Sequence, residues 1–358
     1  MTVPRIVQRR INNRAVAYLE QAVRFGGSPR QLSVYLGPLP MSQRRLRKAA
    51  EAAAPRLAQQ WLSSFAESIA PRWRSEFLQA EETVSLELLR ASHQLSLRFL
   101  AKDEVKRFEA EGFGDYAHGS TSIEGNTMNR AEVEDVLERG ITPAGKSIRE
   151  IHEVVNFANL RRHVESSRLR LTPRFILSLH RVTMQGILMD GLGTFRRIPM
   201  GIRGVDIDLS PGAAIPGEMT ALCRWVEAQQ GIRHPVELAA LFHQRFEEIH
   251  PFIDGNGRVG REAANVILLR WGYPRVIYPK GRRREYMEAL RDGNLGRHRP
   301  LIDLLGSCLA QSVFADSWDT LVEAIGGDTA ELERRAAANP SPPRLPIPRK
   351  KGRLVGPP

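Results

Sequence analysis

Apolar residues three and four positions apart recur along most of this chain, and this spacing places them on one side of an α-helix. Val16–Val23 and Val84–Leu89 follow it within residues 13–107, and Leu238–Ile249 follows it further on. The alternation of apolar and polar residues that marks a half-buried strand is almost absent. The pattern predicts an all-α fold, and a chain of 358 residues with 42% hydrophobic content can bury a substantial core.

One segment departs from the helical pattern. Residues 193–207 have glycines near both ends and β-branched residues between them, so they are predicted to form a small β-hairpin. Their proline and glycines argue against a central strand of a larger sheet. The fold prediction is therefore a helical bundle with one small hairpin.

Helix-start signals become clear after residue 112. Asn129 with Glu132 resembles a capping box and predicts a helix over 130–139, followed by a loop over 140–146. Thr172 and Pro173 predict the N-cap and first position of a helix that runs to about Leu188. Similar patterns predict helices over 148–165, 216–229, 235–249 and 258–271.

These signals divide the chain into four parts. Residues 1–110 are predicted to be an N-terminal helical region with a basic start, and residues 111–312 a central domain. Residues 313–339 are predicted to form a C-terminal helical segment. Residues 340–358, rich in Pro, Arg and Lys, are predicted to be a disordered tail.

The net charge of +12 is concentrated at the two ends. Residues 1–50 contain ten Arg and Lys residues against Glu20 alone, and residues 340–358 add five without any acid. Residues 51–339 are consequently close to neutral, which does not favour a dedicated nucleic-acid-binding surface. We interpret the ends as solvated basic segments, and nucleic-acid binding through them is the alternative.

The cysteine content and the absence of long apolar runs indicate a compartment. Cys223 and Cys308 both lie in helical patterns, which predicts buried thiols in a reducing environment. The sequence contains no apolar run of membrane-spanning length, and no apolar stretch follows the arginines of residues 1–22. We expect a cytoplasmic protein without a membrane span. Its oligomeric state is left open.

The segment from His250 to Arg261 combines several groups suited to phosphate chemistry. Gly255 and Gly257 allow the backbone of Gly255-Asn256-Gly257 to converge its N–H groups into an anion-binding nest. The predicted helix that begins there adds the positive end of its dipole. His250 can accept a proton from an attacking hydroxyl near neutral pH.

Three charged residues extend this set. Asp254 is a hard oxygen ligand suited to Mg²⁺ or Mn²⁺. Arg258 and Arg261 lie three positions apart on the first turn of the helix and are predicted to reach further phosphate oxygens. The combination indicates a reaction at a nucleotide phosphate.

The string His-Pro-Phe-Ile-Asp-Gly-Asn-Gly-Arg-Val-Gly-Arg over residues 250–261 resembles the motif of the Fic family, with every specified position matched. Ser120-Thr121-Ser122-Ile123-Glu124-Gly125 resembles the family's inhibitory-helix motif, which places that helix at about residues 117–126, before the core. The likeness covers about residues 115–310. It implies a Fic-type helical bundle in which a small hairpin acts as a flap.

The resemblance implies a protein adenylyltransferase. His250 would deprotonate a Ser, Thr or Tyr hydroxyl of a target protein, which attacks the α-phosphate of ATP and expels pyrophosphate. Asp254 would hold the metal ion, and the nest of Gly255, Asn256 and Gly257 would stabilise the α-phosphate. Arg258 and Arg261 would hold the outer phosphates. The flap, with Phe195, Arg196, Met200 and Ile202, would clamp an extended segment of the target.

The resemblance also implies inhibition. Glu124, supported by Ser120, would pair with Arg261 and thereby keep ATP out of its productive pose. In some relatives the corresponding glutamate positions water to remove AMP, so a hydrolase acting on AMP-modified protein is an alternative. A catalytically quiet protein that associates with nucleic acid is a second alternative, and transfer of UMP, phosphate or phosphocholine is a third. Asp254 and Asn256 favour AMP.

Overall fold

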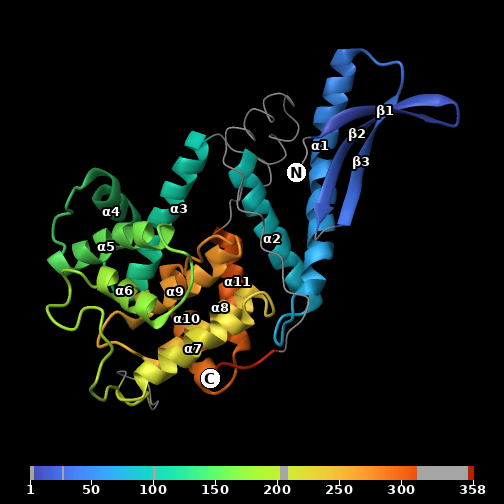
Figure 1. Cartoon of the computed structure of the whole chain (residues 1–358). Helices are drawn as coiled ribbons and strands as arrows, with labels where there is room; N and C mark the ends of the chain where they lie inside the picture. Colours follow the sequence, from blue (N-terminus) through green and yellow to red (C-terminus); the bar gives the residue numbers. More distant parts are fainter. Residues whose placement is uncertain (1–3, 26–27, 100–101, 202–208, 313–353) are drawn as a thin grey trace. The chain divides into compact units, whose positions relative to one another are not determined.

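In a computed structural model of the chain, residues 4–25, 28–99, 102–201, 209–312 and 354–358 are described. The chain divides into two compact units (Figure 1). Within the described residues, unit 1 comprises the chain up to Trp73 together with Gln79–Phe108. Unit 2 comprises Arg74–Leu78, Glu109–Ser312 and the last described residues.

Unit 1 begins with an antiparallel sheet of the order β1-β2-β3, formed by β1 (Arg5–Ile11), β2 (Arg14–Phe25) and β3 (Ser28–Pro38). Asn12 and Asn13 connect the first two strands with φ angles of 50° and 62°. Asparagine tolerates this left-handed conformation, which two-residue hairpin turns require.

The helix predicted at Val16–Val23 is therefore wrong. The buried side chains Ala17, Leu19, Gln21 and Val23 lie two positions apart, as the inward face of a strand requires. Val16 on the other face is also buried, and this removed the alternation from the sequence. The Asn-Asn pair between Ile11 and Arg14 was the local signal for the hairpin.

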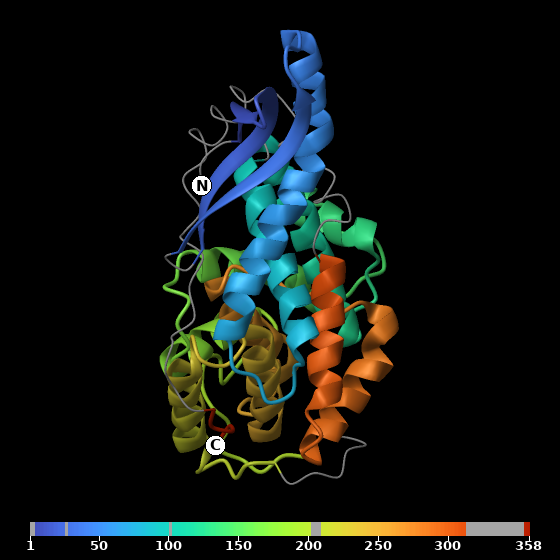
Figure 2. The ribbon, with the colours of Figure 1, turned by 90° about the vertical axis from the view of Figure 1, so that its right-hand side faces the viewer.

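The described part of unit 1 contains the helices α1 (Gln43–Ile69), the short 3₁₀ helix η1 (Ala70–Arg72) and α2 (Ala80–Phe99), and the start of a further helix. Ser42 caps α1 by accepting a hydrogen bond from the Arg45 N–H group at 3.3 Å. Figure 2 shows the strands lying along α1, which contacts β2 and β3. The apolar side of α1, including Leu57 and Phe65, is buried.

Unit 2 is helical in its described residues. The helix α3 (Lys102–Ile123) leads into it from unit 1. The elements that follow are α4 (Arg130–Glu134), the π-helical segment η2 (Asp135–Arg139), α5 (Ile148–Glu165), α6 (Pro173–Thr183), α7 (Ile215–Gln229), α8 (Pro235–Ile249), α9 (Asn256–Arg270), the 3₁₀ helix η3 (Lys280–Arg282), α10 (Arg283–Asn294) and α11 (Arg299–Ser312). The centre is α8, which is buried along most of its length and contacts α7, α9, α10 and α11.

The mostly helical fold is confirmed, and so are several helix boundaries. Asn129 and Glu132 form the capping box of α4, and Thr172 caps α6 with Pro173 in its first turn. The helix α6 ends at Thr183, before the predicted Leu188. Gly186 lies beyond that end with a φ of 72°, a conformation that a helix does not continue through. Cys223 and Cys308 are buried free thiols, as predicted.

Two predicted segments are only partly described. In the predicted hairpin, residues 193–201 contain no strand, and residues 202–208 lie outside the described residues. Residues 313–353 of the predicted C-terminal segments also lie outside them. The described end, residues 354–358, packs on unit 2, where the Trp225 indole donates to the Val355 carbonyl at 2.7 Å. None of the helices in the described ranges has the length and hydropathy that crossing a membrane requires.

Candidate active site

The loop between α8 and α9 is closed by its own side chains. His250 ends α8 in the left-handed conformation, with φ 50° and ψ 61°. Asn256 then accepts a hydrogen bond from the Phe252 N–H group and donates one to the Phe252 carbonyl, both at 2.8 Å. These two bonds fix the Asn256 side chain against the Phe252 backbone and hold the loop closed.

Gly255 is required at the start of α9 for two reasons. Its φ of 83° is a conformation that other residues rarely adopt. A Cβ atom there would also lie 2.6 Å from the Met184 sulfur. The first N–H groups of α9 have no partner within a helix, and they lie at its positive end. The Gly255 N–H group donates to the Asp254 carboxylate at 2.6 Å, so the N–H groups of Asn256 and Gly257 are the ones suited to receive an anion at the predicted nest.

The His250 imidazole is suited to act as a base. Its side chain is only 16% exposed, and its Nδ1 lies 3.7 Å from Glu247 Oε2. Burial lowers the pKa of His250, the Arg196 charge lowers it further, and Glu247 and Glu124 oppose this change. The neutral form, which accepts a proton, is consequently the prevailing form at neutral pH.

Arg196 fixes the backbone beside His250. It is 2% exposed, and its guanidinium donates to the carbonyls of His250 at 2.7 Å, Ile249 at 3.2 Å and Ser210 at 2.7 Å. Its own N–H group donates to the Pro251 carbonyl at 2.9 Å. The contact of Arg196 with the target stays a prediction, and in the structure its guanidinium bonds to backbone carbonyls of the domain.

The other predicted flap residues lie in different surroundings. Phe195 is half-buried and packs on Phe252, with ring centroids 5.7 Å apart. Met200 is half-buried. Ile202 lies outside the described residues. Ile198, which lies between Phe195 and Met200 in the sequence, is 56% exposed.

Asp254 lies between two arginines. Its carboxylate accepts from Arg149 at 2.6 Å and from Arg258 at 3.1 Å. Burial tends to raise the pKa of Asp254, but the hydrogen bond from Arg149 and the charges of both arginines outweigh it and lower the pKa. Asp254 is therefore ionised at neutral pH.

Arg258 and Arg261 point to different partners, although both stand on the first turn and a half of α9. Arg258 is 2% exposed and donates to Glu153 at 3.0 Å as well as to Asp254. The contact of Arg258 with outer phosphates stays a prediction, since these bonds engage its guanidinium with two carboxylates. Arg258 anchors the Asp254 loop to α5 through Glu153.

Arg261 and Glu124 form an ion pair at the end of α3. The Arg261 Nη2 lies 2.7 Å from Glu124 Oε1, and the arginine is 1% exposed whereas the Glu124 side chain is 30% exposed. Arg261 also donates to the Ser120 carbonyl at 2.9 Å, the Ser120 hydroxyl at 3.1 Å and the Tyr286 hydroxyl at 3.3 Å. Burial would lower the pKa of Arg261, but Glu124 and Tyr286 raise it.

Glu124 also lies directly over the anion nest. A Cβ atom at Gly257 would overlap with Glu124 Oε1 and would lie 2.9 Å from Arg261 Nη1. Gly257 thus leaves a space that the carboxylate fills. The structure brings Ser120, Glu124, Gly257 and Arg261 together, so one carboxylate pairs with the arginine and also lies beside Gly257.

Two residues at the site were missed in the sequence. Glu153 is buried and receives bonds from Arg258 and from Asn126 at 3.0 Å. His180 stacks on Phe252, with centroids 3.9 Å apart. Its Nδ1 accepts from the Gly193 N–H group at 2.9 Å, so its Nε2 carries the proton and donates to the Asp254 carbonyl at 3.2 Å. His180 therefore joins the start of the predicted flap to the loop.

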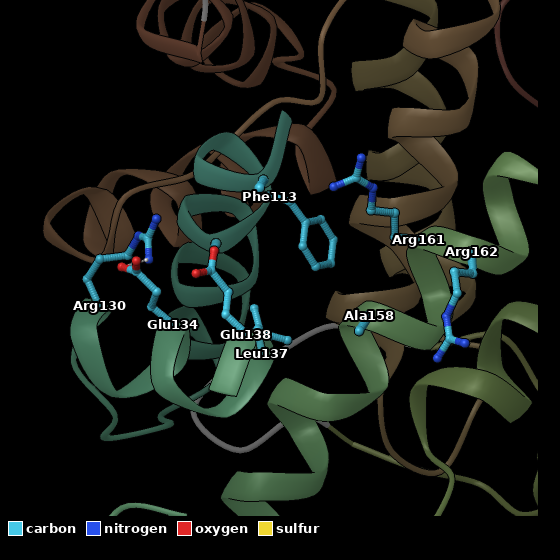
Figure 3. A pocket seen from close by; sticks show the side chains of 10 residues that line it. Phe113, Arg130, Glu134, Leu137, Glu138, Ala158, Arg161 and Arg162 are labelled. Atoms are coloured by element: carbon cyan, nitrogen blue, oxygen red, sulfur yellow. Dashed lines mark hydrogen bonds and ion pairs between the residues drawn. The ribbon is translucent and has the colours of Figure 1, made fainter. Parts of the chain in front are cut away.

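A pocket of about 250 Å³ lies beside α3, the helix that leads to Glu124 (Figure 3). Phe113 of α3 and Leu137 of η2 supply apolar surface, and the Arg161 guanidinium lies 5.2 Å from the Phe113 ring centroid. Arg130 beside it pairs with Asp115 of α3 at 2.5 Å. These contacts hold α3 against α4 and α5.

Comparison with known proteins gives a consistent result. The profile of the Fic/DOC family matches residues 170–268. The protein adenylyltransferase Fic of Drosophila willistoni is 33% identical over 269 residues, which is 72% of this chain and 52% of that protein. Its counterpart in Drosophila grimshawi is 32% identical over 262 residues, 68% of this chain and 53% of that protein. The chain thus spans about half the length of these curated relatives.

Solved structures show the same likeness. A Fic domain containing signaling protein from Bacteroides thetaiotaomicron superposes with a TM-score of 0.59 at 27% identity, covering 66% of this chain and 96% of that one. A glutamate-to-glycine variant of Fic-1 from C. elegans superposes with a TM-score of 0.56 at 26% identity, covering 75% and 82%.

Proposed function

Because the chain carries a domain of the Fic/DOC family, we propose that it is a protein adenylyltransferase that uses ATP and modifies a Ser, Thr or Tyr hydroxyl of a target protein. The observation that carries this proposal is the position of a neutral, half-enclosed His250 beside an anion nest at the start of α9. The relatives named protein adenylyltransferase support the choice of AMP as the transferred group.

In the proposed reaction, His250 accepts the proton of the target hydroxyl. The hydroxyl oxygen forms a bond to the α-phosphorus of ATP, and the bond from that phosphorus to the bridging oxygen of the β-phosphate breaks. Pyrophosphate leaves and AMP remains on the target. The N–H groups of Asn256 and Gly257 stabilise the negative charge that develops on the α-phosphate, and the Gly255 N–H group joins them if it exchanges its bond to Asp254 for one to phosphate. Arg196 keeps the His250 backbone in the strained conformation that presents the imidazole.

A divalent cation fits this site through one carboxylate. Asp254 is ionised and its side chain is 33% exposed, and Mg²⁺ is usually held by one or two carboxylates together with substrate phosphates. Within the described residues there is no cluster of three or more ligating side chains, so ATP itself would supply the remaining ligands. Mg²⁺ or Mn²⁺ bound there would neutralise phosphate charge, and Arg149 would have to release one carboxylate oxygen.

Target recognition at the mouth of the site would be largely apolar. Ile253, which lies between His250 and Asp254 in the sequence, is 53% exposed, and Ile198 of the predicted flap is 56% exposed. A target segment that pairs with the backbone of the flap can cover both side chains. This mode of binding fixes the hydroxyl in place and demands little of the target sequence.

The same site is inhibited by Glu124 in this proposal. A γ-phosphate and the Glu124 carboxylate would both bind Arg261, and the carboxylate lies at the nest. ATP therefore binds productively only when Glu124 leaves. Because Glu124 is partly exposed and close to the nest, it can also orient a water molecule toward a phosphorus, which keeps removal of AMP as a second candidate activity.

The test uses ATP labelled at the α-phosphate, with Mg²⁺, on the full chain and on a lysate. We expect strong protein labelling by Glu124→Gly, weak labelling by the unaltered protein and none by Glu124→Gly combined with His250→Ala. Labelling with ATP carrying the label at the γ-phosphate should be absent, because that phosphate leaves in pyrophosphate. If the active variant labels neither itself nor any lysate protein, or if only the γ-label is transferred, the proposed function is wrong.

A further inference from the structure

Six positively charged side chains gather at one end of unit 1. Arg10 and Arg14 flank the turn between β1 and β2, where Arg10 pairs with Ala15 and Arg14 with Ile11. The Leu39 N–H group donates to the Ala15 carbonyl at 2.8 Å, so the chain leaves the sheet at this end and begins α1 four residues later. The first turns of α1 supply the rest of the cluster: Arg44, Arg45, Arg47 and Lys48.

We call these six residues the basic cluster, and all of them are exposed. Figure 1 shows the β1–β2 turn and the start of α1 at the upper end of unit 1. Arg9, next along β1, differs from them because it pairs with Glu20 at 2.6 Å. Among the residues that the structure describes, no member of the basic cluster makes an ion pair.

The basic cluster is electrostatically unfavourable on its own. The first turn of α1 contains no acidic residue, although the N-terminus of a helix is its positive end and favours negative charge. Four cations within two turns of that end repel the helix dipole and one another. An arrangement with this cost is explained if a polyanion binds there and removes the repulsion.

We propose that the basic cluster binds the phosphate backbone of nucleic acid. Cations spread over a hairpin turn and a helix start can contact several phosphates at once, whereas one small anion would engage only a few of them. The turn itself is polar, with Asn12 and Asn13 at its tip. Ile11, 44% exposed, is the large apolar side chain at the turn, which is too little for insertion into a lipid surface.

The interaction is independent of the transferase site, because the cluster lies wholly in unit 1 and needs neither ATP nor His250. Without any direct reading of bases, it is expected to be insensitive to sequence and sensitive to salt. Each phosphate contact contributes a slope of about −0.9 in a plot of log K against log salt concentration, so six contacts give at most about −5.

The experiment measures fluorescence anisotropy of a labelled DNA duplex of about 20 base pairs with the full chain at several salt concentrations. The variant Arg10→Gln/Arg14→Gln/Arg44→Gln should bind at least about tenfold more weakly, with a salt slope shallower by about 3. The matched control is Arg168→Gln/Arg174→Gln/Arg224→Gln, which removes the same charge from exposed positions of unit 2. We expect the control to bind like the unaltered chain.

Three outcomes would overturn the proposal. The first is that the duplex does not bind at low salt. The second is that both triple variants lose affinity equally, which would mean that only the net charge of the chain matters. In the third, the chain binds vesicles containing phosphatidylserine through the basic cluster and does not bind the duplex. Circular dichroism of both variants checks that unit 1 stays folded, and Arg44→Lys should retain binding because it keeps the charge.

Discussion

Replacing Glu124 is expected to raise AMP transfer in steps that follow the charge of the side chain. Glu124→Gln keeps the size of the side chain and an acceptor for Arg261, whereas Glu124→Gly removes both. Residue 124 follows the last residue of α3, and its N–H group donates to the Thr121 carbonyl in a closing turn. Glycine at this position therefore does not interrupt a helix.

The size of the two steps follows from the Arg261 contacts. Coupling between two ligands of one site is typically about 1–3 kcal/mol, so full release by Glu124→Gly should raise transfer about 5-fold to 150-fold. A charge-assisted hydrogen bond is about twice as strong as a neutral one. Glu124→Gln should then retain about half of the inhibition and raise transfer about 2-fold to 12-fold.

The protein should remain folded in both variants. Breaking a buried ion pair typically costs about 3–5 kcal/mol when it leaves one charge without a partner. Here Arg261 keeps its bonds to Ser120 and Tyr286, and the Glu124 side chain is already 30% exposed. We expect a loss of unfolding free energy below that range, which thermal melting of both variants would measure.

The assay is the initial rate of transfer from α-labelled ATP at saturating Mg²⁺, with the chain itself as acceptor and with a lysate. The order expected is Glu124→Gly, then Glu124→Gln, then the unaltered chain. Equal rates for all three would refute inhibition by Glu124 while leaving the transfer chemistry intact. A Glu124→Gln rate equal to that of Glu124→Gly would show that charge alone holds the carboxylate over the nest.

Four further predictions concern the same site. Gly257→Ala should abolish transfer even in the Glu124→Gly background, because the added Cβ atom would occupy the anion nest. The KM for ATP and the rate of transfer measure this effect. An active double variant would contradict the prediction. Arg196→Gln should lower kcat at least about tenfold and destabilise the fold by about 1–3 kcal/mol, because it leaves carbonyls beside His250 without a donor. Unchanged kinetics and an unchanged melting temperature would count against this prediction. The acid limb of the pH profile of kcat/KM should lie below the ordinary histidine pKa of 6.5, because burial lowers the pKa of His250. In Glu124→Gly the limb should lie lower still, because the negative charge of Glu124, which raises this pKa, is lost. A limb above 6.5 would exclude His250 as the base. Burial raises the pKa of Glu247 to about 8. Its contribution to folding stability is therefore complete below its ordinary pKa of 4.5 and is lost as the pH rises toward 8. The melting temperature of Glu247→Gln should lie above that of the unaltered chain at about pH 9 and close to it at about pH 5.

The helices of unit 2 could be predicted because their boundaries are local. The Asn129 capping box and the Thr172-Pro173 start each depend on a few neighbouring residues, and both are present in the structure. The sheet of unit 1 could not be predicted in the same way, because its middle strand β2 buries residues on both faces. Val16 and Ala17 are adjacent and both buried, which reads as a helix when the partner strands are unknown.

The motif predicted which residues lie at the site but not what each side chain does there. Arg258 and Arg261 stand three positions apart, yet Arg258 turns to Glu153 and Asp254 while Arg261 turns to Ser120 and Glu124. Each arginine has a partner far away in the sequence: Glu153 of α5 for Arg258, and Glu124, directly after α3, for Arg261. Spacing along one helix could therefore place the guanidiniums near the nest but could not assign their roles.

In the proposed mechanism, inhibition and substrate binding use the same two groups, and this determines how inhibition can be relieved. Glu124 bonds to Arg261 and fills the space above Gly257, which are the two places that the proposed phosphate contacts need. Arg261 is held independently by Ser120 and Tyr286, so it stays in position when Glu124 leaves. In the proposed mechanism, the site is thus already assembled while Glu124 is still in place. A signal needs only to displace the end of α3, and the contacts of α3 with Arg130 and Arg161 are where such a displacement would be resisted.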